Sequence, residues 1–423
     1  MYKKYQLQNG VRVILAPLHD TQTVTVLIAF GVGSRFEEQR INGISHFIEH
    51  MMFKGTAKRP TTLDISKELD SVGAEYNAYT GKDVTAYYVK ISQDKLPLAL
   101  DMVSDMLFNS KFDAGEIERE KGVICEEIHM YQDNPLMHVD TLLEEGMFAG
   151  SSLGWDIAGS DETVKGMTRD DMMAYIAKHY EARNIVVGVS GNFDDATAEA
   201  LVTQAFEREW THPEMLADYV PVYMNTTPPE RVMIQKKETE QVQMALGFPA
   251  LPYLHPDMPA LTVLSIILGG NMSSRLFINI RERLGLCYYI KAVHQPYKDT
   301  GSFYVQAGMD KKRIDEAVTA IRGELSKLVT GGITAEELNN AKEYLKGKMA
   351  LQLEDSESVV SWYVTQEIMT KETLTPAEKL AKVFAVTVED VQRVAGDMFK
   401  IEKATLAIIG PYEDKAQFER LLA

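Results

Sequence analysis

The stretch GMTRDDMMAYIAKHYEARNIVVGVSGNFDD at residues 166–195 reappears in outline as AVTVEDVQRVAGDMFKIEKATLAIIGPYED at residues 385–414. Each copy reads as a capped helix, a polar turn, an apolar strand rich in β-branched residues, and then a glycine closely followed by an aromatic residue. Thr168 aligns with Thr387 at an offset of 219 positions (387 − 168). Gly191 aligns with Gly410 at the same offset (410 − 191). A repeat with this spacing predicts two tandem domains of the same fold.

A second pair of segments supports the duplication. FDAGEIEREKGVICEEI, starting at Phe112, parallels ITAEELNNAKEYLKGKM, starting at Ile333, at an offset of 221 (333 − 112). Small insertions account for the difference of two. Near the middle of the chain, REWTHPEMLADYVPVYMNTTPPE carries four prolines and no clear periodicity, which is typical of a linker. We therefore expect a first domain over 1–214, a linker over 215–230 and a second, homologous domain over 231–423.

The first half mixes strand patterns with amphipathic helix patterns. Residues 5–16, 23–30 and 84–92 read as strands, and residues 44–53, 62–72, 93–109 and 113–132 read as helices. Strands and helices do not alternate strictly, so a doubly wound parallel sheet is not favoured. The prediction is an α+β protein with two homologous layered domains, each a mixed or antiparallel sheet covered by helices.

Composition limits the function classes. The 423 residues carry a formal net charge of −17, which argues against a nucleic-acid partner because such proteins neutralise phosphates with basic patches. The two cysteines, Cys125 and Cys287, are too few for a disulfide scaffold. We find no signal segment and no apolar run of membrane-spanning length, so no membrane association and a cytoplasmic location are expected.

A candidate metal-binding motif lies in ISHFIEHMMF at residues 44–53. Its apolar residues fall at i, i+3, i+4, i+7 and i+8, which predicts one buried helix face. His46, Glu49 and His50 fall on the opposite face. Two histidines one turn apart can bind a single ion, and a glutamate beside them can activate water. The order His-x-x-Glu-His is the inverse of the commoner zinc-peptidase motif.

A catalytic zinc site needs a third protein ligand, and the helix predicted at 113–132 offers several. Asp113 and Glu116 form a helix-start signature, and an apolar stripe follows. Glu120 and Glu127 lie two turns apart, about 10 Å along the axis, so both cannot bind one ion directly. The chemistry of the residues leaves open which of Glu116, Glu120, Glu126 and Glu127 is the ligand. The predicted apolar stripe consists of Ile117, Ile124, Ile128 and Tyr131.

With these motifs in view, the chain resembles the pitrilysin and insulinase family of inverted-motif zinc peptidases, which includes the mitochondrial processing peptidases. The resemblance covers essentially the whole chain. It is carried by GISHFIEHMMFKGT (43–56), NAYT (77–80), EREKGVICEEI (118–128) and RERLGLCYY (281–289). By its spacing from the second histidine, the resemblance implies Glu127 as the third ligand of one zinc ion per chain. Glu120 matches the supporting glutamate of the family.

The resemblance also implies substrate-binding residues. Asn77 and Ala78 match family positions that bind the backbone of an extended peptide along a strand edge. Arg281 and Tyr288 match residues of the second half that reach the active site from the opposing domain, where they would bind a substrate carbonyl or stabilise the oxyanion.

The second half is expected to bind no metal. The counterparts of His46 and His50 fall near SIILGGN (265–271), which contains no histidine or glutamate, and the counterpart of Glu127 falls near Lys348. This matches the family pattern of one active and one inactive half. Larger members close four such domains around a chamber, so this chain is expected to form half of a clamshell and to pair as a homodimer or with a homologous subunit.

The function predicted from these features is a zinc-dependent endopeptidase that cleaves peptides or unfolded segments, with Glu49 activating the attacking water. Two alternatives are a non-catalytic subunit of a heteromeric complex, as in relatives that have lost the motif, and a processing peptidase that removes one presequence. The filled motif weighs against the first alternative. The sequence does not decide between processing and degradation.

Overall fold

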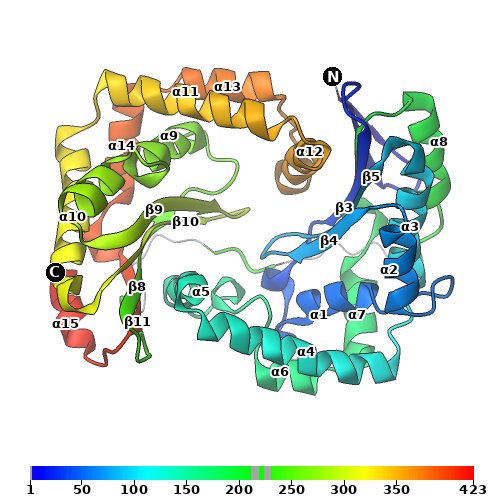
Figure 1. Ribbon diagram of the computed structural model, residues 1–423, viewed down its shortest axis with the longest axis horizontal. Helices are drawn as coiled ribbons and strands as arrows, with labels where there is room; N and C mark the ends of the chain where they lie inside the picture. The colour runs from blue at the N-terminus through cyan, green and yellow to red at the C-terminus, as the bar shows by residue number, and fades with distance from the viewer. Residues whose placement is uncertain (1, 211–218, 223–229) are drawn as a thin grey trace. The chain divides into compact units, whose positions relative to one another are not determined.

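The computed structural model describes residues 2–210, 219–222 and 230–423. Its strands form two mixed sheets (Figure 1). The first sheet has the order β1-β2-β6-β3-β5-β4 and the second β7-β11-β8-β10-β9. The strands of the first are β1 (Lys3–Gln6), β2 (Arg12–Pro17), β3 (Thr23–Phe30), β4 (Glu75–Thr80), β5 (Thr85–Ser92) and β6 (Ile185–Gly191). Those of the second are β7 (Val232–Lys236), β8 (Gln241–Ala250), β9 (Cys287–Pro296), β10 (Gly301–Asp310) and β11 (Thr405–Gly410).

The two sheets repeat one topology. In each, one parallel pair, β2 with β6 or β7 with β11, adjoins a run of antiparallel strands. The repeated sequence segments occupy equivalent places, because a helix capped by Thr168 or Thr387 leads into β6 or β11. Both helix starts are capping boxes, in which the side chains of Asp171 and Asp390 accept a hydrogen bond from the backbone N–H of the capping threonine. The predicted α+β class with two mixed sheets is confirmed.

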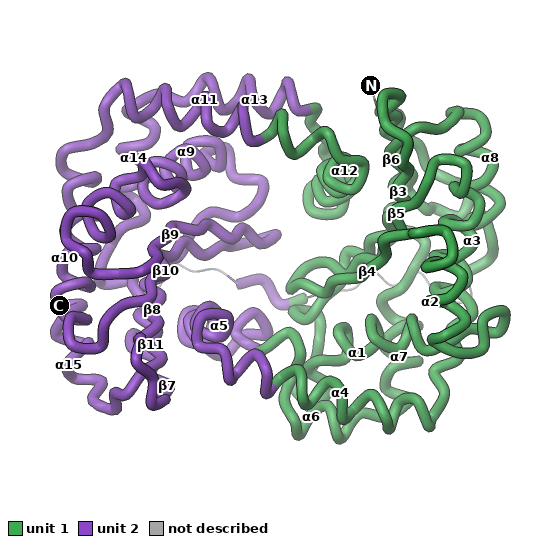
Figure 2. Tube along the Cα trace, in the orientation of Figure 1, with its two compact units in different colours: residues 1–128, 156–219, 349–375 green, residues 129–155, 220–348, 376–423 purple. Residues whose placement is uncertain are grey.

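The chain divides into two compact units, residues 1–128, 156–219 and 349–375 in the first and 129–155, 220–348 and 376–423 in the second (Figure 2). The first unit contains α1 (Ile44–Met52), α2 (Thr62–Asp70), α3 (Leu96–Asn109), most of α4 (Ala114–Asp133), α6 (Asp161–Gly166), α7 (Arg169–His179), α8 (Asp195–Phe206) and α12 (Ser356–Thr370). The second contains α5 (Pro135–Met147), α9 (Met258–Gly269), α10 (Ile314–Gly331), most of α11 (Ala335–Gln352), α13 (Pro376–Phe384), α14 (Val388–Met398) and α15 (Lys415–Leu421).

These units differ from contiguous halves of the chain because each half gives one helix to the other sheet. Helix α12 packs on the first sheet, where Val360 and Val364 join the cluster containing Ile14 and Leu27. Helix α5 packs on the second sheet, where Leu143 joins the cluster containing Ala407. The boundaries 1–214 and 231–423 stay a prediction about the duplicated halves, and most of the linker predicted at 215–230 lies outside the described residues.

In the first unit, helices cover both faces of the sheet. Val24, Val26 and Ile28 of β3 face the larger core, which α1, α3, α4, α7 and α8 complete. The alternate residues Leu27 and Ala29 face α12. Burial on both faces explains why β3 reads as a continuous apolar run rather than an alternating one. Across the described residues, no helix combines the length and apolarity needed to cross a membrane.

Three of the sequence predictions need correction in detail. The strand predicted at 5–16 is a hairpin of β1 and β2, because the chain turns at Gly10, which has φ of 99°. Tyr131 is 37% exposed and does not belong to the buried stripe of α4, which holds Ile117, Ile124 and Ile128. The helix predicted at 93–109 starts as a 3-10 turn and becomes α-helical at Leu96.

Candidate metal centre

Helix α1 carries the inverted motif and is fixed at its N-terminus by the buried side chain of Glu37. Gly43 adopts φ of 95° as the N-cap residue, and a Cβ there would lie 2.5 Å from the carbonyl oxygen of Ala158. Glu37 accepts hydrogen bonds from the backbone N–H groups of Gly43 (2.7 Å) and Ser45 (2.9 Å) and from the Asn42 amide (2.9 Å). These bonds satisfy N–H groups that a helix start leaves without partners.

Packing fixes the rotation of α1 about its axis. The apolar face predicted for this helix is confirmed, since its five members are buried under the sheet. With that face locked against the core, the polar face of α1 is held in one orientation. The buried members are Ile44, Phe47, Ile48, Met51 and Met52.

Three donor atoms from α1 and α4 converge on this polar face, and we call His46, His50 and Glu127 the His–His–Glu cluster. The Nε2 atoms of His46 and His50 are 3.2 Å apart. Glu127 Oε2 lies 3.4 Å from His50 Nε2 and 3.7 Å from His46 Nε2. In the described part of the chain, no other set of three histidine, cysteine or acidic side chains meets in a way that could hold a metal ion.

The cluster has the dimensions of a zinc site. Zinc bonds of about 2.0–2.2 Å in a tetrahedron place neighbouring donor atoms about 3.3–3.6 Å apart. The observed separations of 3.2, 3.4 and 3.7 Å lie within about 0.1 Å of that range. Two imidazole nitrogens and one carboxylate oxygen are also a donor set found in zinc peptidases. The three residues present therefore fit zinc, with the fourth corner left for another ligand.

Glu120 contacts the ring nitrogen of His50 that faces away from the cluster. Its Oε1 lies 2.8 Å from His50 Nδ1, and its Oε2 accepts a bond from Lys54 Nζ at 2.6 Å. A proton on Nδ1 leaves Nε2 of His50 with its lone pair directed at the cluster. Glu120 is 4% exposed, as a supporting carboxylate should be, whereas the Glu127 side chain is 25% exposed.

The three residues of the cluster differ in which protonation state their surroundings favour. Burial, together with the charge of the neighbouring His50, lowers the pKa of His46 to about 4. Burial also acts against the charged form of His50, but hydrogen bonds to Glu120 and Glu127 outweigh it and raise the pKa of His50 to about 9. A hydrogen bond with His50 holds the pKa of Glu127 below its ordinary value. His46 and Glu127 are thus already in their ligating protonation states near neutrality, whereas His50 must release a proton to bind a metal ion through Nε2.

Glu49 lies beside the cluster and is held by a residue from the sheet. Its Oε2 accepts a hydrogen bond from Thr80 Oγ1 at the end of β4. Burial raises the pKa of the Glu49 carboxyl, and the Thr80 bond acts in the opposite direction. A carboxyl with a raised pKa next to a metal-type cluster suits a general base.

Asn77 and Ala78 lie on β4, which is an edge strand of the first sheet and, among the described strands, pairs only with β5. Asn77 is exposed, and its Oδ1 accepts a bond from the N–H of Ala78 at 2.9 Å. Ala78 turns inward to the core. An edge strand next to the motif helix can accept an extended peptide through its main chain.

Arg281 and Tyr288 lie in the second unit and close to each other. The guanidinium carbon of Arg281 is 5.8 Å from the ring centroid of Tyr288 and 4.5 Å from that of Phe277. Arg281 belongs to a π-helical segment (Phe277–Arg283), and Tyr288 follows at the start of β9 with 74% of its surface exposed. Their part in substrate binding stays a prediction.

Sequence reasoning missed three residues that support the cluster. Lys54 continues the series His46, His50 at a further step of four, which could have indicated the same side of the chain. Thr80 falls within the quoted NAYT segment, and its place two residues after Ala78 on a strand predicts the same inward face. Glu37 has no such signal, because it reaches α1 from a 3-10 turn that ends before the helix.

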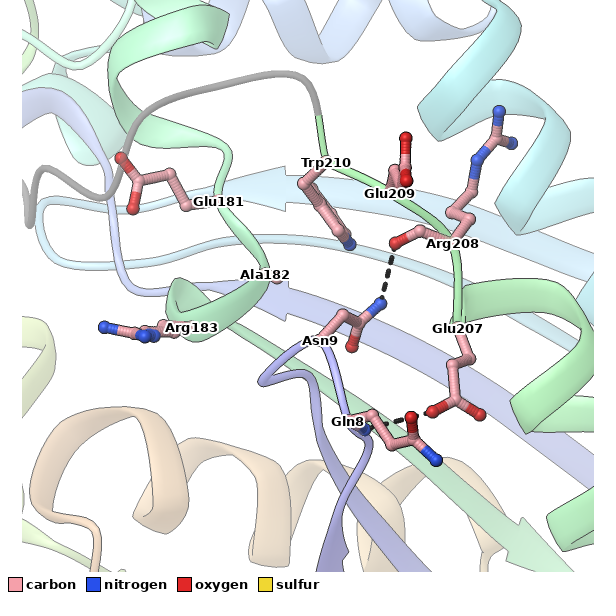
Figure 3. A pocket seen from close by; sticks show the side chains of 9 residues that line it. All are labelled: Gln8, Asn9, Glu181, Ala182, Arg183, Glu207, Arg208, Glu209 and Trp210. Atoms are coloured by element: carbon pink, nitrogen blue, oxygen red, sulfur yellow. Dashed lines mark hydrogen bonds between the residues drawn. The ribbon is translucent and has the colours of Figure 1, made fainter.

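A pocket of about 540 Å³ lies elsewhere on the first unit and shares no residue with the cluster (Figure 3). The turn between β1 and β2 forms one wall, where Asn9 donates to the carbonyl oxygens of Phe206 (2.7 Å) and Arg208 (3.0 Å). Trp210 forms another wall, and the chain beyond it, from 211, lies outside the described residues.

Two regions of the chain match models of one protein family. Residues 12–161 match the model described as "Insulinase (Peptidase family M16)", and residues 166–345 match the model described as "Peptidase M16 inactive domain". A relative from Bacillus subtilis (strain 168), named "Uncharacterized zinc protease YmxG", is 36% identical over 411 residues. That similarity covers 97% of this chain and 98% of the relative.

Solved structures share the fold over nearly the whole chain. A protease from Helicobacter pylori matches with a TM-score of 0.88 and 23% identity, covering 97% of this chain and 99% of its own. A chain from complex III2 of Candida albicans, with Inz-5 bound, matches with a TM-score of 0.82 and 20% identity, covering 100% of this chain and 99% of its own. At these identities the likeness concerns the fold alone.

Proposed function

Because the chain belongs to peptidase family M16, the insulinase family, we propose that it is a zinc-dependent endopeptidase acting on peptides or unfolded polypeptide segments. The observation that carries this proposal is the His–His–Glu cluster, whose donor separations of 3.2, 3.4 and 3.7 Å match the edges of a zinc tetrahedron. The name of the Bacillus subtilis relative, a zinc protease, supports the same metal and reaction class.

His46, His50 and Glu127 would hold one zinc ion per chain. When bound, the ion would polarise the scissile carbonyl and promote attack by water. Glu120 would keep His50 oriented through its bond to Nδ1, and Lys54 would keep Glu120 ionised. Because Glu120 is buried and bonded to both His50 and Lys54, its side chain is held in one position and so keeps His50 in place.

Glu49 would be the general base. Its free carboxylate oxygen takes a proton from the attacking water and returns it to the leaving amide nitrogen as the peptide bond breaks. The raised pKa caused by burial makes the carboxylate a better proton acceptor than an ordinary glutamate. The substrate would lie extended along β4, hydrogen-bonded to the open edge at Asn77 and Ala78. Arg281 and Tyr288 would bind the substrate carbonyl and the developing oxyanion.

The test is a comparison of zinc-loaded wild type with Glu49→Gln on a set of unstructured peptides. We expect the wild type to cut internal bonds and the variant to retain one zinc per chain while losing at least about a hundredfold in rate. Glu126→Gln, an exposed neighbour of Glu127 on α4, is the matched control and should keep full activity. A wild type that binds zinc and cuts no peptide, or a Glu49→Gln variant as fast as wild type, would contradict the proposal.

We further propose that two copies of the chain associate as a homodimer. This chain has two of the repeated domains. Larger members of the family that the sequence resembles enclose a chamber with four such domains. Because the cluster, Arg281 and Tyr288 all belong to one chain, identical copies suffice. Light scattering of the purified protein should give twice the chain mass of 47.5 kDa, and a monomer at micromolar concentration would contradict this.

A further inference from the structure

Among the described residues of the first sheet, only Thr80 has a side chain that hydrogen-bonds Glu49, the proposed base beside the cluster. It is the last residue of β4, and its hydroxyl donates to Oε2 of Glu49 on α1. Among the described residues no group hydrogen-bonds the other carboxylate oxygen, Oε1. The Thr80 bond therefore distinguishes two oxygens that are chemically identical in an isolated carboxylate.

The Thr80 hydroxyl is presented by a rigid element. Thr80 pairs with Thr85 across the β4–β5 hairpin, and the N–H of Gly81 closes the turn onto the carbonyl of Val84 at 2.8 Å. Thr85 is fully buried, and its hydroxyl donates to the carbonyl oxygen of Val32 at 3.0 Å. A donor carried on a paired strand is placed more precisely than one carried on a loop.

A glutamate needs such a partner to act as a base at one point. Its side chain has three rotatable bonds, and only a narrow range of their settings directs an oxygen at the attacking water. A hydrogen bond to an ionised carboxylate is among the stronger ones available to a hydroxyl. Binding Oε2 restricts these torsions and leaves Oε1 to accept the proton.

We infer that Thr80 is a positioning residue for Glu49: its hydroxyl occupies Oε2 and so assigns the proton-accepting role to Oε1. The inference rests on the proposed function, in which Glu49 is the base. It also links the strand proposed to bind peptide with the chemical step, because Ala78 and Thr80 lie on the same inward face of β4. Thr80 acts through Glu49 and makes no contact with substrate.

The decisive variants are Thr80→Val, which keeps the shape and loses the hydroxyl, and Thr80→Ser, which keeps the hydroxyl. We expect Thr80→Val to lower kcat about tenfold to a hundredfold with KM within about twofold of wild type, since a misplaced base costs rate rather than binding. Thr80→Ser should restore most of kcat. Tyr79→Phe removes a hydroxyl from the adjacent residue on the other face of β4 and should leave kcat unchanged.

A binding measurement separates positioning from substrate contact. In the Glu49→Gln background, Thr80→Val should leave peptide affinity, measured by fluorescence anisotropy, within about twofold, because its partner carboxylate is already gone. Zinc stoichiometry and melting temperature should match those of wild type. If Thr80→Val folds poorly, Thr80→Ala tests the same loss of hydroxyl with a smaller side chain.

The possible failures are distinguishable. If zinc-loaded wild type cuts no peptide, the proposed function fails. If wild type cuts peptides and Thr80→Val is equally fast, the positioning role of Thr80 is wrong while the proposed function stands. A rise in KM with unchanged kcat, or weaker peptide binding in the Glu49→Gln background, would show that Thr80 binds substrate and would also overturn the inference.

Discussion

His50 and Glu120 are joined by a 2.8 Å contact between Nδ1 and Oε1, and Lys54 binds the other oxygen of the same carboxylate at 2.6 Å. The contact spans 70 residues of sequence and connects α1 to α4. It fixes which nitrogen of His50 faces the cluster. His46 differs, because its Nδ1 is buried without a hydrogen-bond partner among the described residues. The cluster is therefore held from one side, through His50.

This asymmetry predicts that Glu120 controls metal affinity. Glu120→Ala should weaken zinc binding about tenfold to a hundredfold, the range measured when supporting carboxylates of zinc histidines are removed. Competition with a chelating dye on the purified protein measures the change. Glu118→Ala, on the same helix with its side chain 70% exposed, is the matched control and should leave affinity unchanged. Equal affinities in both variants would show that His50 needs no such support.

Metal removal should affect stability as well as activity. Zinc that binds the folded cluster and not the unfolded chain stabilises by RT ln(1 + [L]/Kd), about 2.7 kcal/mol at a hundredfold excess over Kd. Chelation should therefore lower the melting temperature and abolish cleavage, and added zinc should restore both. Glu127→Gln should lose this zinc-dependent shift, whereas Glu126→Gln should keep it. A melting temperature of wild type that is indifferent to zinc would contradict the assignment of the cluster.

The sequence predicted the local part of the site and much of the fold. The buried face of α1 could be read from its periodicity, and the two histidines follow from a spacing of four. The duplication anticipated the matching capped helices and the strands β6 and β11. Each of these features depends on residues within a few turns of one another or on a direct repeat.

Long-range contacts could not be read in the same way. From residue chemistry alone, several glutamates of α4 could have been the third metal ligand. Which of them faces the two histidines depends on how α4 lies across α1. Periodicity also does not show that α12, from the second half of the chain, covers the first sheet. An apolar helix face predicts burial, but it does not indicate which sheet buries it. The bond between Thr80 and Glu49 is of the same kind, since it joins a strand to a helix 31 residues away.

Glu37 predicts a pH-dependent stability. Burial raises its pKa from 4.5 to about 7, although the hydrogen bonds from Ser45, Asn42 and Gly43 act in the opposite direction. The folded state thus prefers the protonated carboxyl, so the stabilisation is complete below about pH 4.5 and is lost as the pH rises through about 7. From about pH 5.5 to about pH 8.5, the loss should be about 2 kcal/mol.

The measurement is urea unfolding of chelator-treated protein across that range, with Glu37→Gln as the comparison. Glutamine stays neutral, so the difference in unfolding free energy between wild type and Glu37→Gln should move in favour of the variant as the pH rises. Chelation removes the separate pH dependence of zinc binding. A difference that is constant with pH would mean that Glu37 is ionised throughout and caps α1 as a carboxylate.

The exchange of helices predicts one position of the first unit that does not tolerate added volume. Gly188 lies on β6 directly beneath α12, and a Cβ there would lie 2.4 Å from Val360 Cγ2 and 2.5 Å from Val364 Cγ2. Gly188→Ala should therefore destabilise the protein by about 1–3 kcal/mol, the range for overpacked cores. Gly122→Ala, on the exposed side of α4 where an added Cβ would meet no atom within 4 Å, should cost nothing.

A double-mutant cycle assigns that cost to the exchanged helix. Val360→Ala removes one of the two colliding methyl groups, so Gly188→Ala should be less destabilising in the Val360→Ala background than in wild type, by at least about 0.5 kcal/mol. Denaturant midpoints of the four proteins measure the coupling. Strictly additive effects would mean that α12 does not lie on β6 in solution, and the division of the chain into units that exchange α5 and α12 would then be wrong.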